Sequence, residues 1–316
     1  MTRLSKSHIA ITLFCFATSG TAFAASKGDE IRQIVGTCVN VQTSTNAMFG
    51  LGGRVGGGGI VLESLSVSPG ADKAASRSVG MRRLEPLSVT FNSISDFRAL
   101  GGVLAANYRA TLVLNVVDVV SFSSAGPIGA VRYVRPWLSE VTVPELPDVA
   151  SVGVNFGAVF IPELIEFGAN VPCVVSKGAV ANYSRVVLDV PGLNATGLTR
   201  VGSFKISFPA VEATTGVDQI FRKFRPAVPV FTPVTLYFRK AFAPDWSNWT
   251  NWFQQTAQGM NTSRTLAIRM LDRSNAPVAS IVLYDAVPQR LLPQVAGDDQ
   301  LGISGLEVRF SRAEIM

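Results

Sequence analysis

Apolar residues alternate with polar or small residues along much of this sequence. The alternation is clear in residues 59–67 (GIVLESLSV), from Phe204 to Phe208 and from Leu266 to Leu271, and it is typical of half-buried strands. The 28 glycines and 17 prolines divide the chain into short pieces. The pattern predicts a mainly β protein in which many short strands are joined by turns.

Two segments have helical spacing instead. In the second half, Pro244 and Asp245 provide a helix start, and residues 93–106 are the corresponding piece of the first half. The large apolar residues that fall on one side of these helices are Phe97, Leu100 and Leu104 in the first and Trp246, Trp249, Trp252 and Phe253 in the second. A tryptophan row can form a carbohydrate platform, but packing of a helix on a sheet is its commoner use. We therefore expect these side chains in the core.

The two halves of the chain resemble each other. Residues 86–91 (PLSVTF) correspond to 233–238 (PVTLYF), and both halves have a late alternating strand, at 152–160 and 301–310. The residues that align at a constant offset of 154 are Thr111, Leu112 and Asp118 with Thr265, Leu266 and Asp272. Similarity at a near-constant spacing indicates a duplicated domain. We expect two tandem domains, at residues 25–168 and 169–316, each a β-barrel or sandwich with one packed helix.

Residues 1–24 have the three parts of a secretory signal peptide. Arg3 and Lys6 precede an uncharged stretch at 9–20, and Ala22-Phe23-Ala24 supplies the small-x-small cleavage motif. The stretch is too short for a permanent membrane anchor, so we expect no stable membrane span. The sequence predicts cleavage after Ala24 and a secreted or periplasmic protein.

The residue inventory excludes several kinds of chemistry. The single histidine, His8, lies in the signal peptide, so the mature chain has no imidazole for a Ser-His-Asp or Cys-His mechanism and no histidine ligand for zinc. A carboxylate-only hydrolase or a Ser-Lys pair stays open, although no motif singles either out. The formal charge of +6 is spread along the chain, which gives no reason to expect nucleic-acid binding. We expect a non-enzymatic protein without catalytic residues, cofactor or metal.

Two cysteines, Cys38 and Cys173, remain after cleavage. In an oxidising compartment they can form a disulfide bond, which would link the two halves of the chain. The alternative is that each is a small buried apolar residue.

The glycine-rich segment 49–60 lacks the Lys-Ser/Thr of a phosphate-binding loop and the spacing of a dinucleotide-binding turn. We interpret it as a flexible connection between two strands. Two longer connections, 68–85 and 212–232, occupy equivalent places in the two halves, and each contains glycine and basic residues.

The order of elements in the second half resembles the tail-tube family of contractile phages, which is related to the inner tube of type VI secretion. A strand is followed by a long Gly- and Arg-containing loop, the strand TPVTLYF, a tryptophan-rich helix and the strand RTLAIRMLD. Residues 285–288 (DAVP) then correspond to a turn that usually carries tryptophan in that family, and GLEVRF closes the domain. The similarity covers roughly 186–315 and, more loosely, 37–164.

The resemblance implies that six domains form a ring, with sheets edge to edge around a pore. Two domains in one chain would make this ring a homotrimer with pseudo-hexameric symmetry. The long loops of the family reach neighbouring subunits, so the resemblance implies interface roles for Arg82, Arg83, Arg222, Lys223 and Arg225. An export signal and a duplicated domain are departures from that family.

The sequence offers two alternatives to self-assembly. A secreted monomeric binding module or adhesin would expose part of the tryptophan row. An outer-membrane barrel commonly ends in an aromatic residue, whereas this sequence ends in Ile315-Met316, so we disfavour it.

Overall fold

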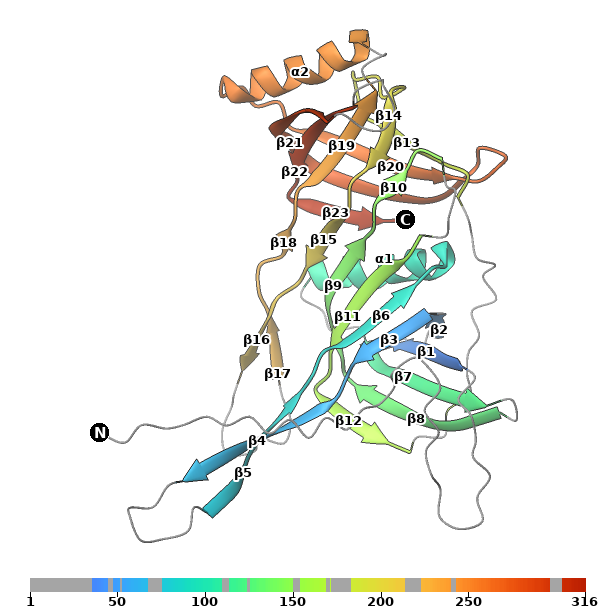
Figure 1. Ribbon diagram of the computed structural model, residues 1–316, viewed down its shortest axis with the longest axis vertical. Helices are drawn as coiled ribbons and strands as arrows, with labels where there is room; N and C mark the ends of the chain where they lie inside the picture. Colours follow the sequence, from blue (N-terminus) through green and yellow to red (C-terminus); the bar gives the residue numbers. More distant parts are fainter. Residues whose placement is uncertain are drawn as a thin grey trace.

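The structure is a computed structural model of the 316-residue chain. The residues that it describes are 36–44, 48–51, 53–67, 76–109, 114–123, 126–149, 154–168, 171, 183–213, 223–239, 243–295 and 303–316. The predicted signal peptide lies outside these residues. The two halves lie one above the other along the longest axis, with the N-terminal half below (Figure 1).

The described residues are mainly β, which confirms the fold class predicted from alternation. The elements of the first half are β1 (Gly36–Thr43), β2 (Met48–Leu51), β3 (Gly53–Gly57), β4 (Ile60–Val67), β5 (Ser76–Leu84), β6 (Leu87–Phe91), α1 (Ile94–Tyr108), β7 (Leu114–Ser123), β8 (Gly126–Val134), β9 (Trp137–Val143), β10 (Leu146–Pro147), β11 (Phe156–Ile161) and β12 (Leu164–Phe167).

The second half runs in a similar order. Its elements are β13 (Arg185–Asp189), β14 (Leu198–Val201), β15 (Phe204–Ser207), β16 (Ala210–Ala213), β17 (Lys223–Pro226), β18 (Val230–Phe231), β19 (Val234–Arg239), α2 (Ala243–Ala257), β20 (Arg264–Leu271), β21 (Pro277–Val295), β22 (Ile303–Arg309) and β23 (Arg312–Ile315).

Three larger sheets and two hairpins organise these strands. One sheet has the order β12-β8-β7-β1-β2, and a second has the order β18-β15-β9-β11-β6-β3. The third runs β10-β14-β19-β22-β21-β20-β13, with β23 also on β21. The hairpins β4–β5 and β16–β17 project from this body (Figure 1). The second sheet contains strands from both halves, and so does the third.

The two halves have the same order of antiparallel strand pairing. The row β1-β7-β8-β12 of the first half corresponds to β13-β20-β21-β23 of the second. The row β9-β11-β6-β3 corresponds to β21-β22-β19-β14. The long strand β21 therefore takes the places of both β8 and β9.

These pairings correct the alignment drawn from sequence. Val117 lies opposite Tyr133 on β8, and Leu266 lies opposite Leu283 on β21, so the equivalent positions of β7 and β20 are 149 residues apart, not 154. Asp272 lies after β20, where its carboxylate accepts the Ser274 amide N–H at 2.8 Å. The sequence alignment was wrong because short alternating strands resemble one another in several registers.

A bend separates the consecutive strands β8 and β9, and an equivalent bend lies within β21. Arg135 and Asp285 occupy it with φ values of 47° and 50°, a region that non-glycine residues seldom adopt. In both halves, the residue just before the last strand holds this bend: Glu163 pairs with Arg135 at 3.1 Å, and the Ser311 hydroxyl donates to Asp285 Oδ2 at 2.6 Å. The DAVP segment is thus a bend within one strand and not a turn between two.

The glycine-rich segment is also more ordered than its composition predicts. It contributes β3, which pairs with β6 from Gly53–Phe91 to Gly57–Leu87. A Cβ on Gly53 would lie 1.7 Å from the Thr90 carbonyl oxygen, so this pairing requires glycine. The interpretation of residues 49–60 as a flexible connection was therefore wrong.

The helices pack as predicted. Ser93 caps α1 by accepting the Asp96 amide N–H at 3.3 Å, and α1 buries its apolar face. Trp249 and Trp252 are fully buried, and their indole N–H groups donate to the Asn194 and Thr262 carbonyl oxygens at 2.7 Å. The carbohydrate-platform alternative is therefore excluded for these two residues. One continuous hydrophobic cluster contains side chains from both halves. In the part of the chain that the structure describes, no helix has the length and apolar character to cross a membrane.

Candidate assembly surfaces

A strand ladder joins the two halves. β15 of the second half lies antiparallel to β9 of the first, in pairs that run from Phe204–Val143 to Ser207–Glu140. On the exposed face of this ladder, Lys205 Nζ forms an ion pair with Glu140 Oε1 at 2.9 Å. β15 therefore occupies the edge that β9 would otherwise offer to another strand.

The inner side of the ladder is packed and hydrogen-bonded. The Trp137 indole N–H donates to the Phe208 carbonyl oxygen at 2.8 Å, and the Phe208 amide N–H donates to the Ser139 carbonyl oxygen at 2.7 Å. The Phe208 ring meets Tyr108 edge to face, with centroids 5.0 Å apart. These contacts fix the register of the ladder.

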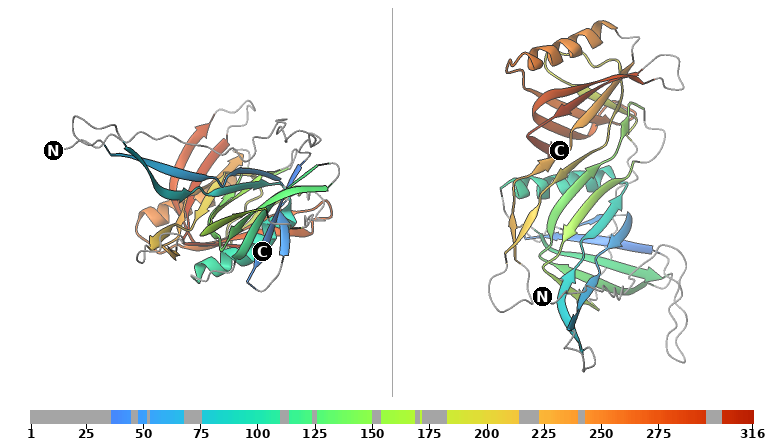
Figure 2. Two further views of the ribbon diagram at one scale, coloured as in Figure 1. Left: turned by 90° about the horizontal axis from the view of Figure 1, so that it is seen from below. Right: turned by 60° about the vertical axis from the view of Figure 1, so that its left-hand side comes forward.

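Helix α1 of the first half covers the outer edge of β23 in the second half, and Figure 2 shows this helix at mid-height of the molecule. The Ala313 amide N–H donates to the Tyr108 hydroxyl oxygen at 2.9 Å. The approach is close, because a Cβ on Gly101 would lie 2.2 Å from the Ile315 carbonyl oxygen. Burial raises the pKa of Tyr108 to about 12, so its hydroxyl stays neutral at physiological pH.

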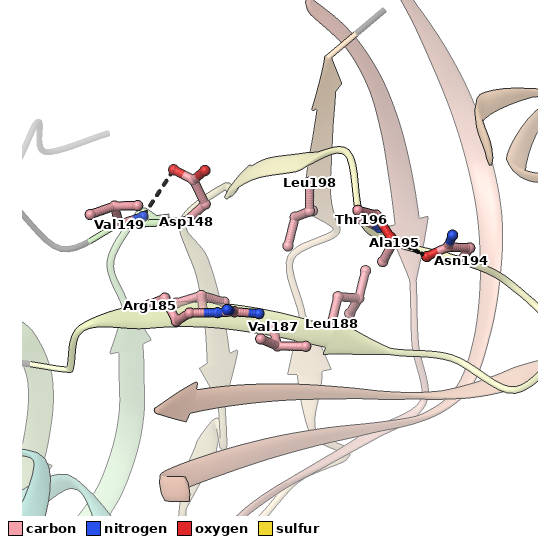
Figure 3. A pocket seen from close by; sticks show the side chains of 10 residues that line it. Asp148, Val149, Arg185, Val187, Leu188, Asn194, Ala195, Thr196 and Leu198 are labelled. Atoms are coloured by element: carbon pink, nitrogen blue, oxygen red, sulfur yellow. Dashed lines mark hydrogen bonds between the residues drawn. The ribbon is translucent and has the colours of Figure 1, made fainter. Parts of the chain in front are cut away.

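A third contact follows β9. β10 pairs with β14, and an isolated bridge joins Val149 to Arg185. A cavity of about 430 Å³ lies beside it (Figure 3). The residues that line this cavity are Asp148, Val149, Arg185, Val186, Val187, Leu188, Asn194, Ala195, Thr196 and Leu198. Most of these are aliphatic, and among the described residues no cluster of His, Cys, Asp or Glu could hold a metal ion.

Equivalents of the two sides of the β9–β15 ladder recur elsewhere in the chain, but among the described residues they do not pair with each other. Residues 288–295 of β21 correspond to β9, because Leu291 lies opposite Leu306 on β22 as Val141 lies opposite Ala158 on β11. The start of β4 corresponds to β15, since each is the first strand of its hairpin region. Within the described ranges, residues 288–295 pair only with β22 and β4 pairs only with β5.

The two elements that form the helix contact, α1 and β23, also have equivalents elsewhere in the chain. α2 is equivalent to α1, and β12 is equivalent to β23, since β12 pairs with β8 as β23 pairs with β21. Phe167 at the end of β12 is 58% exposed. In Figure 1, α2 and the β21–β22 pair lie at the upper end of the molecule, whereas β12 and the β4–β5 hairpin lie at the lower end.

Four of the five predicted interface cations lie on hairpin strands. Arg82 and Arg83 belong to β5, and Lys223 and Arg225 belong to β17, so the described parts of the two long connections include hairpin strands. Arg222 lies outside the described residues. The interface role of these five residues stays a prediction.

Cys38 lies in β1 and is disulfide-bonded. It packs in a small cluster with Val120, Ala130 and Val171. Cys173 lies outside the described residues, so a Cys38–Cys173 bond stays a prediction.

Comparison with known proteins gives little. The sequence matches no protein-family model and no curated protein. Among solved structures, part of the chain is similar to a chain in "Cryo-EM structure of the anti-feeding prophage (AFP) baseplate, 6-fold symmetrised". The two are 17% identical, the match covers 42% of this chain and 90% of that chain, and the TM-score is 0.34. At this TM-score the likeness carries no conclusion about function.

Proposed function

We propose that this protein is an exported, non-enzymatic structural subunit that assembles head to tail with other copies through strand edges. One observation carries the proposal. A junction is made once inside the chain, between β9 and β15, and equivalents of its two sides lie at opposite ends of the described structure, each with one strand edge that no described strand pairs with.

The same geometry sets the kind of assembly. Residues 288–295 of one copy would accept β4 of the next, because main-chain hydrogen bonds across a strand edge provide a general mode of association. α2 of the first copy would then lie on β12 of the second, as α1 lies on β23 within the chain. An interface that joins two different surfaces repeats from copy to copy, and it yields a ring where the rotation closes.

A closed ring is the form we favour. Three copies would supply six repeats, in agreement with the resemblance to tail-tube proteins, and closure would pair every copy of residues 288–295 with a copy of β4. The basic hairpin residues would contact neighbouring copies or rings. The predicted signal peptide supports an assembly in the periplasm or outside the cell.

The alternative of a monomeric binding module has less support. It depended on an exposed tryptophan row, whereas Trp249 and Trp252 are 0% and 1% exposed. No other observation favours it.

The test uses the mature chain from residue 25. Size-exclusion chromatography with light scattering and electron microscopy should show rings or stacks of rings. A monodisperse monomer at high concentration would refute the proposal.

A further inference from the structure

We infer that the junction between copies carries a charge pair of reversed polarity relative to the junction inside the chain, with Arg290 of one copy facing Glu85 of the next. This inference rests on the proposed head-to-tail assembly and names the residues that select its partner, a second copy of this chain. Inside the chain, the β9 side carries the acid, Glu140, and the β15 side carries the base, Lys205.

Arg290 occupies the position of Glu140. Each of the two residues follows a bulge, at Ser139 in β9 and at Gln289 in β21. Arg290 is exposed, and among the described residues it forms no ion pair. Glu307 lies opposite it on β22, but no salt bridge joins the two. Residues 288–295 therefore carry a cation, Arg290, at the position where β9 carries an anion, Glu140.

Gly59 is the backbone equivalent of Lys205, and the Glu85 side chain fills the space where the Lys205 side chain would begin. Two backbone hydrogen bonds show the equivalence: the Thr232 amide N–H donates to the Lys205 carbonyl oxygen at 3.1 Å, and the Glu85 amide N–H donates to the Gly59 carbonyl oxygen at 2.9 Å. Gly59 thus stands in the place of Lys205. A Cβ on Gly59 would lie 2.7 Å from Glu85 Oε2, so the Glu85 carboxylate covers the place where the lysine side chain begins.

Glu85 also lacks an ion pair among the described residues. When 288–295 of one copy aligns with β4 of the next in the internal register, Ile60 faces Leu291, as Ile206 faces Val141. This alignment brings the Glu85 carboxylate to the side of the ladder that carries Arg290.

The reversed polarity selects between correct and incorrect neighbours. β4 placed on β9 of another copy would bring Glu85 to Glu140, and β15 placed on 288–295 would bring Lys205 to Arg290. Like charges at an interface suppress wrong pairings, and opposite charges support the intended one. The two junctions therefore cannot exchange strands without repulsion, and the repeats alternate strictly along the assembly.

The experiment uses charge reversal in the mature chain. Glu85→Arg and Arg290→Glu should each weaken assembly about tenfold or more by sedimentation velocity, because each places like charges across the junction. The double variant, and a 1:1 mixture of the two single variants, should associate again. Arg309→Glu is the matched control, because this exposed arginine lies on β22 inside the same sheet, and it should assemble as the wild type does.

The outcomes separate the two proposals. A monomeric wild type would refute head-to-tail assembly and this inference with it. An assembled wild type with single variants that assemble equally well would overturn the charge pair alone. So would a double variant that stays monomeric while its circular dichroism shows a native fold.

Discussion

The contact between α1 and β23 can be tested by adding one methyl group. Gly101 and Gly102 are neighbours in α1, but Gly101 is buried against β23, whereas Gly102 is exposed and has open space around its Cβ position. Replacing either glycine by alanine gives the same gain in helix propensity, about 1 kcal/mol. The two variants therefore differ only in what the new methyl group meets.

The structure sets the expected magnitudes. In Gly101→Ala the methyl group would lie 2.2 Å from the Ile315 carbonyl oxygen, and this backbone atom cannot rotate away. Helix and strand must separate, which costs about 1–3 kcal/mol for overpacking. Separation also weakens the hydrogen bond from the Ala313 amide to Tyr108, and a buried N–H without a partner costs a further 1–3 kcal/mol or so. We expect Gly101→Ala to destabilise the fold by about 1–5 kcal/mol after the gain in propensity, and Gly102→Ala to stabilise it by about 0.5–1 kcal/mol.

Urea unfolding of the mature chain, followed by circular dichroism and tryptophan fluorescence, measures both free energies. Equal stability of the two variants would refute the reasoning, because it would mean that α1 does not rest on β23. A loss in both variants would point to a helix that does not tolerate alanine at all.

Two further predictions concern charge and covalent bonding. The Tyr284 hydroxyl and a nearby arginine lower the pKa of Glu314 below its usual 4.5, so this carboxylate stabilises the fold above that pH, and its contribution is lost as the pH falls through the lowered pKa. Between pH 6 and pH 3 the wild type should thus lose more stability than Glu314→Gln in thermal melts, and parallel losses would contradict this assignment. Non-reducing peptide mapping of the exported protein should find Cys38 linked to Cys173, whereas a free thiol at Cys173 would rule the bond out.

Local patterns in the sequence predicted most of the elements. Alternation identified β15 and β20, and the Pro244-Asp245 start with its tryptophan row identified α2, because periodicity and capping are properties of neighbouring residues. The burial of Trp249 and Trp252 followed from the same pattern.

Properties that depend on distant contacts could not be predicted in this way. The register between the halves was misjudged by five residues, since a period of two fits several alignments. Asp285 looked like a turn residue, because nothing local shows that the strand continues beyond it. The pairing of β15 with β9 joins segments about 60 residues apart. The proposed interface role of Glu85 and Arg290 follows only from that pairing, so the sequence alone could not predict it.

In the proposed assembly, the β9–β15 ladder would also set the order in which contacts form. Because β15 is tethered to β9, it samples that edge at an effective concentration in the millimolar range, far above that of any free copy. Each newly folded chain is therefore expected to form its own β9–β15 ladder first, which covers the β9 edge before a strand of another copy can bind there. In the proposed assembly, further copies would add only at the two ends of the molecule, so that chains would join end to end without branching.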